Sequence, residues 1–174
     1  MNKLNLLHAA IVSASLFLGA GAALAVTPLS PADQAFLKNA YQTGLFEIKS
    51  GTYAGDNAEN SSVRDLGKDI ASDHTSLNKK LADFAQDHGY ALPTDLTSTT
   101  VKKVSAFSAL SGTALDKAYL KSVSGKHEEA ILAYKKESAT TSNADLRELI
   151  NGALPTLKDH AEKAELLNTK LAAR

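Results

Sequence analysis

The sequence contains no cysteine, and its single methionine is the initiator, Met1. Without cysteine the fold cannot be held together by disulfide bonds. Thiolate and thioether groups are the ligands that Cu(I) prefers, so their absence beyond residue 1 argues against a Cu(I) carrier.

An excess of charge of one sign is missing as well, because 19 Lys and Arg balance 19 Asp and Glu. No long basic run could follow a phosphate backbone or an anionic membrane surface, so neither nucleic acid nor membrane is expected as a partner.

The chain has no sustained period-two pattern and no repeat of solenoid length, which argues against sheets and repeat folds. It also lacks a phosphate-binding Gly-rich loop, a G-x-S-x-G elbow and His-Glu-x-x-His, and no nucleophile or acid–base pair is identifiable, so no catalytic residues are assigned.

Residues 1–25 have the parts of a signal peptide. Lys3 supplies the positive start, an apolar stretch runs from Leu4 to Leu18, and Ala23-Leu24-Ala25 forms an A-x-A cleavage site. The apolar stretch is short for a membrane span and contains Ser, Gly and Ala, so cleavage is favoured over a retained anchor. The sequence therefore predicts a cleavable signal peptide at 1–25 and a periplasmic or secreted domain at 26–174. No later segment is apolar enough to span a bilayer.

Four long segments of the mature part have helical apolar spacing. The first begins with a capping box at Ser30-Pro31-Ala32-Asp33 and should weaken at Gly51 and Gly55 before a polar break at 56–60. The second should begin near Ser62, where Ser62-Val63-Arg64-Asp65 repeats the capping-box pattern, and end at Gly89.

The third helix should begin at Thr113 with a capping box closed by Asp116, and the fourth after an Asn143 cap. Pro155 should bend the fourth helix toward its histidine. The connection at 89–112 is long, and the spacing of its apolar residues predicts a short extra helix within it. The pattern predicts an all-α fold, a four-helix bundle with a long connection between its second and third helices.

Histidine stands in the middle of three apolar stripes, as His74, His127 and His160, and Glu47 occupies an inward position of the first helix. At about 1.5 Å of rise per residue, the four side chains should lie in one layer of an up-down-up-down bundle. If the long connection crosses the bundle instead, the levels still agree to within about two turns.

Burying unpaired Glu and His side chains costs several kcal/mol or forces them neutral, so these groups should satisfy one another or a cation. Imidazole and carboxylate ligands suit Zn, Mn, Fe, Ni or Cu(II), and the sequence thus indicates a mononuclear site of Glu47, His74, His127 and His160. A buried Glu–His network without metal explains the same pattern. A di-iron centre is disfavoured, because Ala71, Ser124 and Leu157 stand where Glu-x-x-His would place its glutamates.

Asp73 and Asp159 each precede one of these histidines, so either could orient a neighbouring ligand or be a surface charge. His88 ends the second helix, where a cation suits the helix dipole, and is left out of the cluster.

The order of several motifs resembles the bacterial exported family called domain of unknown function 4142, over roughly residues 33–168. The motifs are Ile70-Ala71-Ser72-Asp73-His74, Tyr90-Ala91-Leu92-Pro93, Ser111-Gly112, Asp116-Lys117-Ala118-Tyr119-Leu120, His127 and Leu154-Pro155-Thr156-Leu157-Lys158-Asp159-His160. Leu115 replaces an aromatic residue usual in the family, and the methionine usual before its Asp-His is missing. The resemblance implies a ferritin-like bundle in the periplasm or at the outer membrane, and implies no activity.

Two functions are favoured by these observations, and an enzyme ranks third because no nucleophile or acid–base pair is identifiable. The first is metal binding for buffering or stress protection in the cell envelope. The second is a non-catalytic helical interaction module whose polar layer only fixes the register of the helices.

Export should leave Val26 as the first residue of the mature protein, because the A-x-A site ends at Ala25. Mass spectrometry of the periplasmic fraction measures this terminus. Full-length chain retaining Met1 in the membrane fraction would contradict the prediction.

Overall fold

The computed structural model describes residues 28–173, and the predicted signal peptide at 1–25 lies outside them. Five α-helices follow one another: α1 Pro31–Asn57, α2 Ser61–Asp87, α3 Ser98–Ser108, α4 Gly112–Thr140 and α5 Ala144–Ala172. No strand occurs between residues 28 and 173. Within the same part of the chain, no helix combines the length and the apolar character that crossing a bilayer requires.

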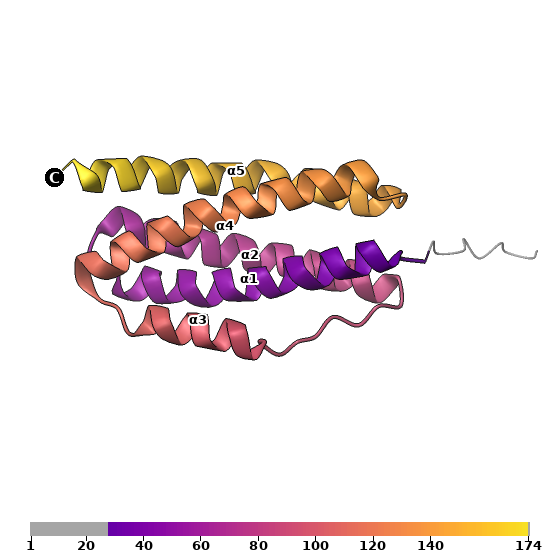
Figure 1. The fold of residues 1–174 in the computed structure, drawn as a ribbon, viewed down its shortest axis with the longest axis horizontal. Helices are drawn as coiled ribbons and strands as arrows, with labels where there is room; N and C mark the ends of the chain where they lie inside the picture. Colours follow the sequence, from indigo (N-terminus) through magenta and orange to yellow (C-terminus); the bar gives the residue numbers. More distant parts are fainter. Residues whose placement is uncertain (1–27, 174) are drawn as a thin grey trace, which may run out of the picture.

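The helices form two antiparallel hairpins, α1 with α2 and α4 with α5 (Figure 1). The connection from α2 to α4 runs back along the bundle and carries α3, which packs mainly on α1. Because of this crossover, α2 and α4 run in the same direction. The structure confirms the predicted fold class, a ferritin-like four-helix bundle whose long connection holds a short extra helix.

Two of the predicted helix caps are confirmed. Ser30 N donates to Asp33 Oδ2 (2.8 Å) and Asp33 N donates to Ser30 Oγ (3.1 Å), which completes the capping box of α1. Asn143 Oδ1 accepts from Leu146 N (3.0 Å) at the start of α5. These side chains satisfy amides that the first turn of a helix leaves free.

The caps predicted at Ser62 and Asp116 are wrong. Asn60 caps α2 instead, through a hydrogen bond from Ser62 N to Asn60 Oδ1 (2.9 Å). The buried Asp116 carboxylate faces the turn between α1 and α2 and accepts from the amides of Glu59 and Asn60, each at 2.9 Å. A capping pattern within one helix cannot show that a free amide of a neighbouring hairpin competes for the same carboxylate.

α1 continues through Gly51 and Gly55 and ends at Asn57, within the polar break predicted at 56–60. Both glycines lie where α1 crosses α2. A Cβ added to Gly51 would lie 2.7 Å from the carbonyl oxygen of Gly67, and one added to Gly67 would lie 2.7 Å from the amide nitrogen of Gly55. The glycines therefore permit a close approach of two helix backbones.

The core consists of two apolar clusters with a polar layer between them. One cluster includes Ile70 and Val123, and the other includes Leu81 and Leu157. Each of α2, α4 and α5 contributes to both clusters, and its histidine stands between the two contributions. α5 passes through Pro155 without interruption and keeps His160 buried. The fold thus carries the three histidines to the middle of the bundle.

Candidate metal centre

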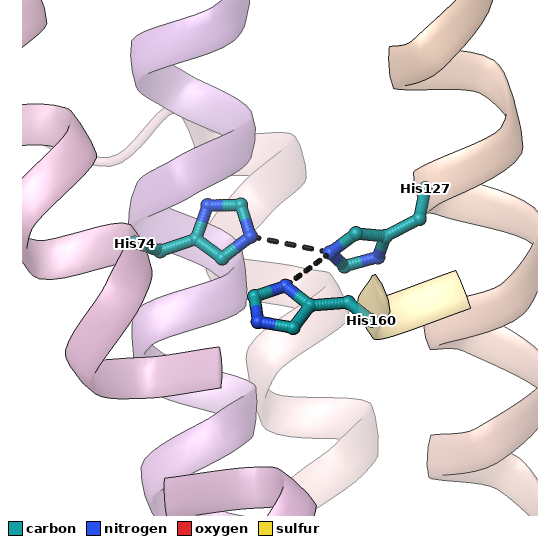
Figure 2. A group of neighbouring side chains, drawn as sticks. All are labelled: His74, His127 and His160. Atoms are coloured by element: carbon teal, nitrogen blue, oxygen red, sulfur yellow. Dashed lines mark hydrogen bonds between the residues drawn. The ribbon is translucent and has the colours of Figure 1, made fainter. Parts of the chain in front are cut away.

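Three histidine side chains meet in this polar layer, His74 from α2, His127 from α4 and His160 from α5 (Figure 2). They expose only 5%, 2% and 1% of their surface, respectively. His74 follows Ile70 by one helical turn, and His127 follows Val123 in the same way, so the apolar stripe that buries each helix also turns its imidazole inward.

One ring nitrogen of each histidine lies within 4.8 Å of the other two. His74 Nε2 is 3.3 Å from His127 Nε2, which is 3.2 Å from His160 Nδ1. Imidazole nitrogens bind zinc at about 2.0–2.1 Å, which places two nitrogens of a tetrahedral set roughly 3.3 Å apart. The two nitrogen–nitrogen distances to His127 therefore match the spacing that one tetrahedral ion requires.

Neutral tautomers cannot satisfy all the contacts among these nitrogens. His127 Nδ1 lies 2.9 Å from the carbonyl oxygen of Val123 and donates to it, so its Nε2 carries a lone pair. His160 Nε2 lies 3.0 Å from Asp73 Oδ2 and donates to it, so its Nδ1 also carries a lone pair. Two lone pairs then face each other at 3.2 Å.

Rearranging the protons does not remove this conflict. His74 Nε2 can donate a hydrogen bond to His127 Nε2. His160 Nδ1 then faces a His127 lone pair that already accepts this bond, and its own lone pair has no donor. A proton added at His160 Nδ1 would compete with His74 for the same single acceptor. A cation at the centre can accept all three lone pairs at once.

The surroundings keep two of the rings neutral. Burial, together with the neighbouring charges of His127 and His160, lowers the pKa of His74 to about 3. Burial, followed by the charge of His160, lowers the pKa of His127 to about 4, although the hydrogen bond to the Val123 carbonyl opposes this shift. Neutral imidazole is the form that binds metals, so these rings are ready to act as ligands at neutral pH.

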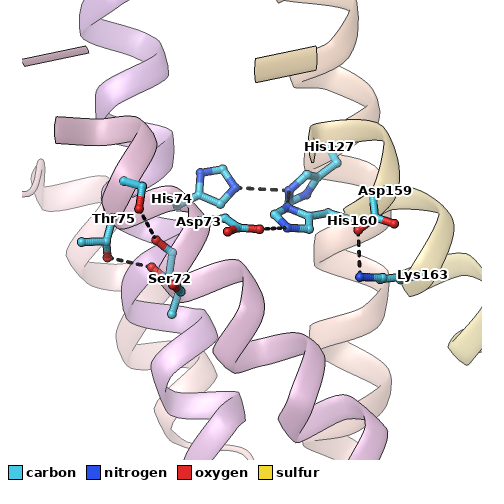
Figure 3. Close-up of polar contacts among 10 residues, drawn as sticks. Ser72, Asp73, His74, Thr75, His127, Asp159, His160 and Lys163 are labelled. Atoms are coloured by element: carbon cyan, nitrogen blue, oxygen red, sulfur yellow. Dashed lines mark hydrogen bonds and ion pairs between the residues drawn. The ribbon is translucent and has the colours of Figure 1, made fainter. Parts of the chain in front are cut away.

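The two aspartates that precede histidines have different surroundings (Figure 3). The Asp73 carboxylate, whose side chain is 51% exposed, accepts from His160 Nε2 and so fixes the tautomer that presents Nδ1 to the cluster. Asp159 Oδ2 instead lies 2.8 Å from Lys163 Nζ, one turn along α5. Asp73 is therefore the aspartate that orients a member of the triad.

Glu47 is buried in the same bundle but does not belong to the group of mutually close ligand atoms. Its Oε1 has no hydrogen-bond partner, and neither does the hydroxyl of buried Tyr119. Burial raises the pKa of Glu47 to about 8, against the opposing charge of Lys126, so the side chain is an uncharged acid at neutral pH. The structure thus brings together three of the four predicted ligands.

The remaining histidine of the described part, His88, lies at the end of α2, away from the triad. Its Nδ1 is 2.8 Å from the carbonyl oxygen of Phe84, and its Nε2 is 3.2 Å from Asn143 Nδ2. No sequence motif indicates that the Val123 carbonyl selects the tautomer of His127. Val123 and His127 are four residues apart, which permits the contact, but every helix contains pairs with this spacing.

The model of one family, the domain of unknown function DUF4142, matches residues 18–167 of the chain. This match confirms the resemblance found in the sequence motifs. No curated protein matches the chain.

Two solved structures have a similar fold. The first is a DUF305 fragment from Deinococcus radiodurans, with a TM-score of 0.72 and 12% identity over 83% of this chain and 99% of that one. The second is CopM in the Cu(I)-bound form, with a TM-score of 0.68 and 14% identity over 80% of this chain and 96% of that one. At such low identity the similarity concerns the fold alone.

Replacing Glu47 with Gln should remove a pH-dependent loss of stability. The pKa of Glu47 is about 8 in the folded chain against an ordinary value of 4.5, so its contribution to stability is complete below the lower value and is lost as the pH rises through the higher one. Each unit of pKa difference corresponds to about 1.4 kcal/mol. Urea unfolding of the metal-free protein between pH 5 and pH 8 should show Glu47→Gln gaining stability relative to the parent as the pH rises.

The matched control is Glu162→Gln on the exposed face of α5. Its stability should follow that of the parent at every pH. Parallel curves for Glu47→Gln and the parent would show that the Glu47 carboxyl ionises alike in the folded and unfolded chains.

Proposed function

We propose that this chain, which belongs to the DUF4142 family, binds one transition-metal ion through His74 Nε2, His127 Nε2 and His160 Nδ1. The observation that carries the proposal is the group of three convergent nitrogens whose contacts no arrangement of protons on neutral rings satisfies. The spacing near 3.3 Å and the low pKa values of His74 and His127 support it.

The donor set limits the choice of metal. Three imidazoles suit zinc, copper and nickel better than they suit manganese, which prefers carboxylate and water oxygens. Iron remains a candidate, although the glutamates of a di-iron centre are missing. The neighbour described as CopM was solved with Cu(I) bound, which makes copper a metal to test in both oxidation states.

The proposed physiological role is metal buffering or stress protection in the cell envelope. It rests on the signal peptide predicted at residues 1–25, which would place the mature domain in the periplasm or outside the cell. The triad offers ligands but no nucleophile, so the proposal includes no enzymatic reaction.

The second candidate function is that of a helical interaction module. The observation in its favour is that the polar layer lies between two apolar clusters, where it fixes the heights of α2, α4 and α5 relative to one another. In that case the histidines would act only through hydrogen bonds.

His127→Ala distinguishes the two candidates. If the triad binds metal, zinc or copper present at 100 times its dissociation constant stabilises the parent by about 2.7 kcal/mol, and the variant loses this gain. The measurement is the melting temperature of untagged protein with chelator and with each metal. His88→Ala, which removes a half-buried histidine outside the triad, should respond to metal as the parent does.

In the module function, His127→Ala costs roughly 1–3 kcal/mol with or without metal. If the melting temperature of the parent is unchanged by chelator, zinc, nickel and both oxidation states of copper, the metal proposal is overturned. His74→Ala provides a second variant with the same expected outcome if His127→Ala fails to fold.

The two aspartates offer a further test. Asp73→Asn should weaken metal binding by about 10–100-fold, because the amide no longer holds His160 in the tautomer that presents Nδ1. Asp159→Asn removes the same charge from the neighbouring helix and disrupts only the pair with Lys163. Competition titration with a chromophoric chelator measures both affinities, and equal affinities would show that Asp73 does not orient a ligand.

A further inference from the structure

Two hollows reach the histidine layer through different helix interfaces. The first lies between α2 and α5, has a volume of about 390 Å³, and is lined by both His74 and His160 together with Asp73. The second, of about 460 Å³, lies between α1 and α4 near the start of α3, and of the triad it touches His74 alone.

The first hollow gives the more direct contact with the candidate site. Two of the three ligands line it, and so does the carboxylate that hydrogen-bonds to one of them. Of the lining side chains, the carboxylates of Asp73 and Glu148 are exposed and form the mouth, whereas His74 and His160 are buried. The second hollow offers one imidazole behind a largely apolar and cationic lining.

Charge separates the two hollows further. The charged residues that line the first are Asp73, Glu148 and Lys80, an excess of negative charge. Those that line the second are Lys38, Lys103, Lys126 and Glu129, an excess of positive charge. Because a cleft lined by charges of one sign attracts ions of the opposite sign, the lining of the first hollow favours cations and that of the second disfavours them.

We infer that the hollow between α2 and α5, here called the α2–α5 channel, is the path by which a transition-metal cation reaches the histidine triad. Asp73 and Glu148 at its mouth raise the local concentration of the cation. This inference rests on the proposed function, since it concerns the route to that site. It adds that the ion passes through one face of the folded bundle and needs no separation of the hairpins.

Gly152 provides a test that leaves the ligands untouched. It lines the α2–α5 channel, and apart from its chain neighbours and the backbone of its own helix no heavy atom lies within 4 Å of a Cβ built on it. Gly152→Leu therefore extends a side chain into the channel without a clash. Gly125→Leu is the matched control, because Gly125 is also an exposed helical glycine with open space at its Cβ and lines neither hollow.

Stopped-flow mixing of the metal-free protein with Co(II) or Cu(II) measures uptake, and excess chelator measures release. Gly152→Leu should slow both rates by about 10-fold or more, with the stoichiometry and the dissociation constant unchanged, because a plug alters the barrier and leaves the end states alone. Gly152→Ala should fall between the parent and Gly152→Leu. Gly125→Leu should match the parent in both rates.

A pair of charge variants tests the role of the mouth. Glu148→Gln should slow uptake several-fold at low salt, and this difference should shrink at high salt as the charges are screened. Glu129→Gln, which removes the same charge from the second hollow, should leave the uptake rate unchanged.

The outcomes separate this inference from the proposed function. If the parent takes up no ion, the proposed function fails and the route fails with it. If the parent takes up an ion and Gly152→Leu does so equally fast, the route is overturned while the metal site stands. A Gly152→Leu variant that loses affinity at equilibrium also overturns the route, because the residue would then act on the site itself.

Discussion

The mutual contact of three imidazole nitrogens inside an apolar core constrains the middle of this bundle. A buried nitrogen lone pair without a partner costs free energy, and here two lone pairs meet at 3.2 Å. The rings cannot turn away to water, because apolar clusters above and below the layer hold α2, α4 and α5 in place. Two of the rings also resist protonation, since burial lowers the pKa of His74 and His127. Binding a cation would relieve this contact without moving a helix.

Much of this arrangement could be predicted from apolar periodicity. The spacing of Ile70 from His74 and of Val123 from His127 indicates which way each imidazole points, and the rise per residue indicates its height in the bundle. For Glu47, the height along the bundle does not predict whether the side chain joins the triad. The side chain of Glu47 is buried, but it comes from α1 and lies near Lys126 and Tyr119 instead of in the triad. Which residues on one level touch depends on the distances and rotations between helices, and these do not follow from one helix at a time.

The roles of Gly51 and Asp116 both depend on contacts with a neighbouring helix or turn. Within its own helix, a glycine such as Gly51 is a weak point. Its contact with Gly67 shows that the missing side chain is what allows α1 and α2 to pack closely. Read alone, Asp116 is a cap for its own helix, but its carboxylate accepts hydrogen bonds from the turn between α1 and α2. The α2–α5 channel likewise depends on how the two hairpins dock. Local patterns predict the elements, whereas contacts between the hairpins decide the roles of residues at their surfaces.

The charge of the ion would be little compensated at this site. All three proposed donors are neutral, Glu47 is uncharged at neutral pH, and Asp73 acts only through His160. A divalent ion would therefore keep most of its charge in a region of low dielectric constant, which favours a monovalent ion. Ligand softness opposes this preference, since Cu(I) prefers sulfur donors and the described part of the chain contains no cysteine or methionine. The choice between copper oxidation states and zinc depends on the balance of these two effects.

The position of the triad also relates metal binding to the assembly of the fold. His74 belongs to the hairpin of α1 and α2, whereas His127 and His160 belong to that of α4 and α5. Contacts within each hairpin are far more extensive than those between the hairpins, so docking of the two is the weaker step. An ion bound to all three nitrogens would tie the hairpins together, and only a docked bundle would present the complete site. Binding free energy would then appear as stability of the interface between the hairpins, which is where a ligand that selects the folded state contributes.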